Sequence, residues 1–132
     1  MEYVIKGGYE MAAIFTTELG NVIIDDEVIA KVAGLAALEC YGVVGMASIN
    51  VKDGLVQLLL GENLTKGIKV RTEEGQTTIE FHIIVEYGTN ISVIADNLIS
   101  NVKYAVKNML GLELADVSVY VEGIRTENQE KA

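Results

Sequence analysis

The sequence predicts an α/β domain of the α+β kind, in which a mixed β-sheet carries two main helices packed on one face. Apolar residues alternate strictly within residues 66–72 and 77–87, as expected for strands with one buried face. They recur at helical spacing over residues 28–38 and 91–110, as expected for helices with one buried face. The length of 132 residues fits one domain. We therefore expect the element order β-α-β-(short α)-β-β-α-β.

The first part of the chain predicts a strand followed by a helix. Residues 1–17 show no clear period, and we expect an N-terminal segment that is partly mobile. Residues 18–24 read as the strand. The acidic run 25–27 then suits a helix N-terminus, where carboxylates accept hydrogen bonds from free N–H groups. Gly42 supplies a stop for this helix.

The middle of the chain predicts a second strand over residues 43–52. A short apolar turn or helix is expected over Leu55–Leu60, ended by Gly61. A strand, a helix, a glycine and an alternating strand also occur twice along the chain. Either a β-α-β duplication or a chance likeness of two similar units explains this pattern.

The two clearest strands, residues 66–72 and 77–87, are joined by a hairpin signal at residues 73–76. Their apolar faces must pair, and a slip of one residue would bury Glu80. The register is therefore well specified. The expected cross-strand pairs are Val70 with Ile79, Ile68 with Phe81, and Lys69 with Glu80.

The last part of the chain predicts a long helix and a final strand. The helix follows a cap at Asn90 and ends at Gly111, and the strand covers residues 114–121. We expect a single domain over residues 18–124, followed by a polar C-terminal tail at residues 125–132.

Composition narrows the classes of function. The net charge of -9 repels phosphate backbones and anionic headgroups, which disfavours nucleic acid binding and direct binding to a membrane surface. Cys40 is the only cysteine, and a lone thiol suits a reducing compartment. The most apolar stretch, residues 33–47, contains Glu39 and is too short to span a bilayer. A cytoplasmic location is therefore expected.

Three patterns carry potential chemistry, and each has a simpler explanation. His82, with Glu80 and Glu86 on the same strand face, could hold a metal for hydrolysis, but a solvated strand face looks the same. Residues 25–27 could bind a cation, but helix capping explains them. Gly42–Gly45 matches the GxxG pattern with which KH domains clamp nucleic acid, but its middle residues are valines. We therefore expect no catalytic residues, cofactor or metal.

The polar face of the long helix is the remaining candidate site. Its side chains lie off the apolar stripe and include two lysines one helical turn apart. We predict that this face binds a partner protein, although solvation alone also accounts for it. The predicted partner-binding residues are Asn97, Asn101, Lys103, Tyr104 and Lys107.

Several segments, taken in order, resemble the bacterial alkaline shock protein family, which acts in the envelope stress response of Gram-positive-type bacteria. The ordered set carries the resemblance over about residues 18–124, and no single segment does. The chain departs from the family at Ser92, where a proline is expected to open the helix; serine is an acceptable first-turn residue. The resembling segments are Gly20–Ile24, Tyr41–Met46, Asn63–Ile68, Ile83–Gly88 with Ile91, Val102-Lys103, and Val117–Val121 ahead of Gly123.

The resemblance implies a small cytoplasmic α/β domain without an established enzymatic activity. Members of the family are thought to lie at the inner face of the membrane, held there by separate membrane-anchored proteins. We therefore expect a non-enzymatic adaptor or scaffold that binds a protein partner, with homo-oligomers left open. The alternative is a KH-like nucleic-acid-binding module that uses the loop Gly42–Gly45, and a metal-assisted hydrolase around His82 comes third.

Overall fold

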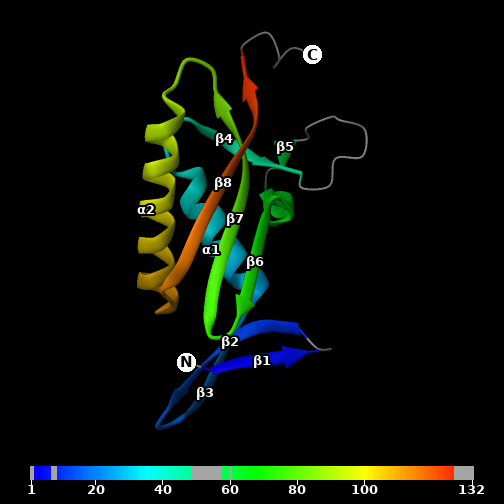
Figure 1. Cartoon of the computed structure of the whole chain (residues 1–132), viewed down its shortest axis with the longest axis vertical. Helices are drawn as coiled ribbons and strands as arrows, with labels where there is room; N and C mark the ends of the chain where they lie inside the picture. Colours follow the sequence, from blue (N-terminus) through cyan, green and yellow to red (C-terminus); the bar gives the residue numbers. More distant parts are fainter. Residues whose placement is uncertain (1, 7–8, 49–57, 60, 127–132) are drawn as a thin grey trace.

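The computed structural model describes residues 2–6, 9–48, 58–59 and 61–126, which form two helices, one 3-10 helix and eight strands (Figure 1). The elements are β1 (Glu2–Lys6), β2 (Tyr9–Thr17), β3 (Gly20–Asp25), α1 (Asp26–Leu38), β4 (Val43–Ala47), β5 (Leu58–Leu59), the 3-10 helix η1 (Gly61–Gly67), β6 (Ile68–Glu73), β7 (Gln76–Glu86), α2 (Ile91–Leu110) and β8 (Leu114–Arg125).

The main sheet is built around β7, its longest internal strand. β8 pairs with β7 in parallel along residues 77–86, which occupies one whole edge of β7. β6 and β4 share the other edge, and both run antiparallel to β7. β5 extends the sheet beyond β4. The prediction of a mixed sheet is therefore confirmed.

The hairpin of β6 and β7 has the register that the sequence predicts. Val70 lies opposite Ile79, and Ile68 lies opposite Phe81. Because side chains alternate between the faces of a sheet, this register places Ile79 and Phe81 on the same buried face. Lys69 lies opposite Glu80 on the other face.

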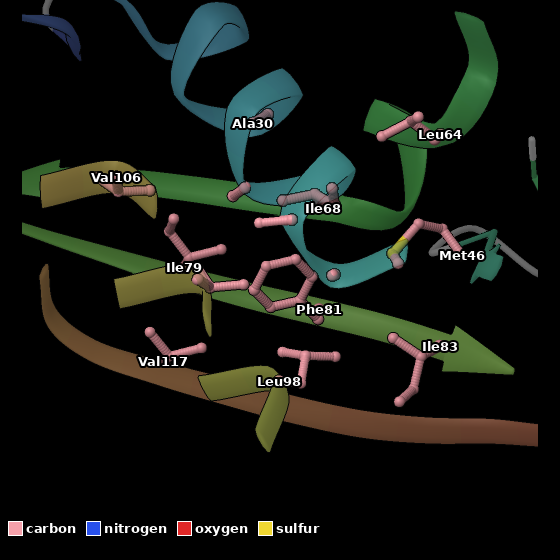
Figure 2. Close-up of a cluster of buried hydrophobic side chains, with 14 of the residues drawn as sticks. Ala30, Met46, Leu64, Ile68, Ile79, Phe81, Ile83, Leu98, Val106 and Val117 are labelled. Atoms are coloured by element: carbon pink, nitrogen blue, oxygen red, sulfur yellow. The ribbon is translucent and has the colours of Figure 1, made fainter. Parts of the chain in front are cut away.

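The core lies between one face of the main sheet and both helices. Phe81 stands near its centre, with Leu98 of α2 beside it in the close-up of Figure 2. α1 contributes mainly small buried residues, which allow it to lie close to the sheet and to α2. The expected packing of two helices on one face is confirmed. The fully buried core side chains include Ile29, Met46, Leu64, Ile79, Phe81, Ile83, Leu98, Val102, Val106 and Leu112.

Three of the four predicted helix boundaries are confirmed. Asp25 caps α1 by accepting a hydrogen bond from the Glu27 N–H at 3.0 Å, and Asn90 caps α2 by accepting one from the Val93 N–H at 3.2 Å. Gly111 ends α2 with a φ of 69°, which glycine adopts without a Cβ clash.

Gly42 is not the stop of α1, contrary to the prediction. The helix ends at Leu38, because the Glu39 and Cys40 N–H groups turn back to the Ala36 and Ala37 carbonyls. Gly42 instead serves the turn into β4, with a φ of 90°. A Cβ at this position would lie 2.5 Å from Cδ1 of Ile94, so the glycine also permits close contact with α2.

The N-terminal region differs most from the prediction. Residues 1–17 show no sequence period, yet they contain β1 and β2, which form an antiparallel three-stranded sheet with β3. β3 is therefore paired outside the main sheet. The β-α-β duplication is not found, because β3 and β4 lie in different sheets while β7 and β8 pair directly.

The short helix also lies elsewhere. Leu58 and Leu59 form β5, and the short helix is η1, seven residues from Gly61 to Gly67. Gly61 was expected to end a short turn or helix, and it instead begins η1. The rest of the segment predicted as a turn or helix, and residues 49–52 of the predicted second strand, fall outside the described residues.

Candidate protein-interaction surface

The outward face of α2 contains all five residues predicted to bind a partner. They are exposed, and the core-facing residues of the helix, such as Leu98 and Val102, lie on its opposite side. Asn97, Asn101 and Tyr104 follow each other at spacings of four and three residues, so they form one row along the helix. The Tyr104 side chain is 71% exposed although it is large and aromatic. This row offers an exposed hydrogen-bonding and aromatic surface.

Lys103 and Lys107 form a second row, four residues apart. Lys107 Nζ lies 3.1 Å from Oε1 of Glu113, and both side chains are more than half exposed. An exposed pair of this kind contributes little to stability. The lysines are therefore available to a partner without a large cost to the fold.

Asn101 has a structural role that the sequence did not indicate. Its Nδ2 donates a hydrogen bond to Sγ of Cys40 at 3.1 Å, which links α2 to the residues that follow α1. The buried Cys40 thiol donates in turn to the Ala36 carbonyl at 3.7 Å. Asn101 thus holds α2 against the residues that follow α1.

Val93 belongs to this surface but was missed. It lies one turn before Asn97 and is 53% exposed. The sequence feature that could have indicated Val93 is that it is an apolar residue outside the buried stripe of α2. With Tyr104, Val93 gives the polar face two larger apolar contacts, which is typical of protein interfaces.

His82 lies among carboxylates on the face of the main sheet that points away from the helices. Its Nε2 lies 2.9 Å from Oε2 of Glu80, and its Nδ1 lies 3.7 Å from Oε1 of Glu122. The ring stacks on Tyr120 with a centroid distance of 4.9 Å. The two carboxylates therefore face opposite ring nitrogens, and they do not converge on one position where a metal could bind.

Only part of this arrangement was predicted. Glu86, the third residue of the predicted set, forms an ion pair with Arg125 at 2.9 Å and does not contact the imidazole. Glu122 and Tyr120 come from β8, and the parallel register that sets Tyr120 beside His82 is not visible in the sequence. Among the described residues no cluster of three or more histidine, cysteine or acidic side chains could hold a metal ion.

The Gly42–Gly45 segment is not the loop that a KH-like clamp requires. Val43 begins β4, and Gly45 is buried opposite Ile84 of β7. The Gly42 carbonyl accepts a hydrogen bond from the Glu86 N–H at 2.9 Å. The backbone that would contact a phosphate is therefore paired within the sheet.

The acidic run at the start of α1 is divided between two roles. Asp25 caps the helix, whereas Asp26 accepts a hydrogen bond from Thr72 Oγ1 of β6 at 3.4 Å. Burial raises the pKa of Asp26, the hydrogen bond from Thr72 opposes this change, and the neighbouring Asp25 charge adds to it. These contacts account for the acidic run without a bound cation.

Comparison with known proteins identifies the family. The model of the alkaline shock protein 23 family, described as having a cell envelope-related function, matches residues 15–126. This chain belongs to that family. The matched range contains β3, both helices and the whole main sheet. The resemblance noted in the sequence is thereby confirmed.

Relatives in the alkaline shock protein 23 family span most of the chain. An uncharacterized protein of Bacillus subtilis, YloU, is 48% identical over 119 residues, covering 89% of this chain and 99% of the relative. The uncharacterized protein Spy1614 of Streptococcus pyogenes is 36% identical, covering 87% of this chain and 96% of the relative. A Streptococcus pyogenes protein named as a homolog of the stress response regulator gls24 is 33% identical, covering 86% of this chain and 63% of the relative.

No solved structure matches this chain. Among the described residues, neither helix is long and apolar enough to cross a membrane.

Proposed function

We propose that this chain is a non-enzymatic adaptor or scaffold of the envelope stress response, which acts by binding a membrane-anchored protein near the inner face of the membrane. The outward face of α2, extended to include Val93, is the proposed binding surface. The observation that carries the proposal is the exposure of Tyr104 and Val93 among exposed polar residues of the same helix face.

The chemistry of this face suits protein recognition. Tyrosine is enriched at interfaces because its ring supplies apolar area while its hydroxyl forms hydrogen bonds. Asn97 adds an amide, and Lys103 adds a charge that can pair with a carboxylate of the partner. A rigid helix that is fixed to the core by Leu98 and Val102 holds these groups in place.

Two further observations support the proposal. The family has a cell envelope-related description, and one relative is named as a homolog of a stress response regulator.

The test uses charge reversal on α2. The double substitution Lys103→Glu/Lys107→Glu should reduce recovery of the crosslinked membrane partner from host cells by about tenfold, as expected when a loss of about 1.4 kcal/mol weakens binding. Glu113→Gln is the matched control, because it breaks the Lys107 ion pair and leaves both lysines in place. Equal recovery from the double variant and the wild type, with both folded, would remove α2 as the binding surface.

A further inference from the structure

β8 is an edge strand of the main sheet among the strands that the structure describes. It pairs with β7 on one side, and no described strand pairs with its other side (Figure 1). Between two register shifts, the six residues Asp116–Val121 pair with β7 without interruption. An edge strand leaves backbone N–H and C=O groups unpaired along its outer side. β8 thus presents a regular template for one more strand.

This edge has few of the features that normally prevent strand addition. Natural sheets protect their edges with lysine, proline, bulges or short strands. β8 is 12 residues long, and its two register shifts lie outside Asp116–Val121. From Leu114 to Ile124 it contains no lysine, arginine or proline. Its charged residues over that stretch are Asp116 and Glu122. The edge is therefore open and acidic.

The two carboxylates lie on the face of the sheet that points away from the helices. Asp116, Ser118 and Tyr120 alternate on that face, and Glu122 reaches it beside His82. Asp116 is exposed and accepts one hydrogen bond, from Ser118 Oγ at 3.4 Å. Tyr120 is 47% exposed and lies between the carboxylates along the strand. Cationic side chains of a bound segment could pair with Asp116 at one end of this row and with Glu122 at the other. Between these carboxylates, a cationic side chain could contact the ring of Tyr120.

We infer that the β8 edge binds an extended, cationic segment of a partner protein, which adds to the main sheet as a further strand. The segment would place lysine or arginine opposite Asp116 and Glu122, about six residues or 20 Å apart. Its alternate residues would be β-branched and would lie beside Val119 and Val121, which face the helix side of the sheet. This inference rests on the proposed function, because it assigns the chemistry of the protein segment that the adaptor binds.

Charge favours this occupant over a second copy of the chain. Each copy has a net charge of -9, so two copies repel each other at long range. A paired copy would also add its own Asp116 and Glu122 to an edge that is already acidic. A basic strand instead neutralises both carboxylates, and opposite charges across paired strands are favourable.

A synthetic peptide tests the inference directly. The peptide Lys-Val-Thr-Val-Thr-Val-Lys, labelled with a fluorophore, places two lysines six residues apart on one face and valines on the other. Binding to the full chain is measured by fluorescence anisotropy at 0.15 M salt. A twin with glutamate in place of both lysines should bind at least about tenfold more weakly, and a twin with proline at the central valine should not bind as a strand.

Variants of the chain locate the binding. Asp116→Lys/Glu122→Lys should weaken the lysine peptide by at least about tenfold. The single variant Asp116→Lys should give part of this loss of affinity. It keeps the Glu122 contact with His82, so it tests the inference even if the double variant is unstable. Glu18→Lys/Glu39→Lys changes the net charge equally at exposed positions outside β8 and should leave the affinity within about twofold.

Hydrogen exchange supplies the structural readout. Bound peptide should slow exchange of outward amides in Asp116–Val121 and leave those of β6 unchanged. Equal binding of the lysine and glutamate peptides, equal loss in the control variant, or dimerisation of the chain through β8 would each overturn the inference. The α2 variant Lys103→Glu/Lys107→Glu should still bind the peptide. The peptide assay therefore tests the β8 edge separately from the α2 surface of the proposed function.

Discussion

The amide of Asn101 on α2 donates a hydrogen bond to the buried thiol of Cys40, 3.1 Å away. The two residues are 61 positions apart in the sequence, and the bond joins α2 to the residues that follow α1. A residue that lies on the polar face of α2 therefore also supports the fold. Asn101 therefore has a structural hydrogen bond in addition to its place on the polar face, in contrast to the exposed Asn97 one turn away on the same row.

Replacing Asn101 should affect stability more than replacing Asn97. Asn101→Ala should lower the free energy of unfolding by about 1 kcal/mol, because it removes a hydrogen bond to a buried group. Asn97→Ala, at an exposed position, should stay within about 0.5 kcal/mol of the wild type. Urea denaturation of both variants measures the difference, and equal stabilities would mean that the Asn101–Cys40 bond contributes nothing.

Gly34 allows α1 to pack closely against η1 and β6. A Cβ at this position would collide with Cδ1 of Leu64 and would lie 2.7 Å from Cδ1 of Ile68. Gly34→Ala should therefore destabilise the protein by about 1–3 kcal/mol through overpacking. Helix propensity alone predicts the opposite sign, a gain of about 1 kcal/mol. The sign of the change in thermal or urea unfolding decides between the two.

Asp26 should give the stability a particular dependence on pH. Burial raises its pKa in the folded protein above the unfolded value of 3.8, so the folded state binds the proton more tightly. The contribution of this group to stability is therefore present below pH 3.8 and is lost as the pH rises through the folded pKa. Asp26→Asn removes the titration, so its stability relative to the wild type should increase as the pH rises through that window. A difference that stays constant across the window would contradict this account.

The stacking of His82 on Tyr120 should couple β7 to β8. A double-mutant cycle with His82→Ala and Tyr120→Ala should give an interaction energy of about 0.5–1.5 kcal/mol, the range for ring pairs. Lys69→Ala with Tyr120→Ala serves as the control cycle, because Lys69 lies on β6, and the strand that pairs with β8 among the described residues is β7. Additive effects in the first cycle would show that the stacked rings do not interact.

The sequence predicts local structure well where one physical rule dominates. The β6–β7 register follows from alternation, and the caps at Asp25, Asn90 and Gly111 follow from the chemistry of helix ends. It does not reveal β1 and β2, because a small sheet with little alternation lacks a period. It also mislocates the end of α1, where backbone hydrogen bonds stop the helix before Gly42.

Contacts between distant segments are the larger gap. Nothing local indicates that β8 pairs in parallel with β7, so the contacts of His82 with Tyr120 and Glu122 could not be predicted. The α2 face was found because the off-stripe residues of an amphipathic helix must face outward. Asn101 was assigned to that face from its position, and its bond to Cys40 depends on the packing of α1 against α2. Single elements and the local β6–β7 hairpin can thus be predicted from the sequence, whereas contacts between elements distant in the sequence cannot.

The most direct measurement is the identity of what binds the chain in its native host. A tagged chain is crosslinked gently, and the proteins and nucleic acids that co-purify from membrane and soluble fractions are identified. The adaptor account predicts a small membrane-anchored protein as the main partner. Its recovery should be unchanged with Glu113→Gln and about tenfold lower with Lys103→Glu/Lys107→Glu. Recovery of RNA that disappears after nuclease treatment, with no membrane protein, would contradict the account.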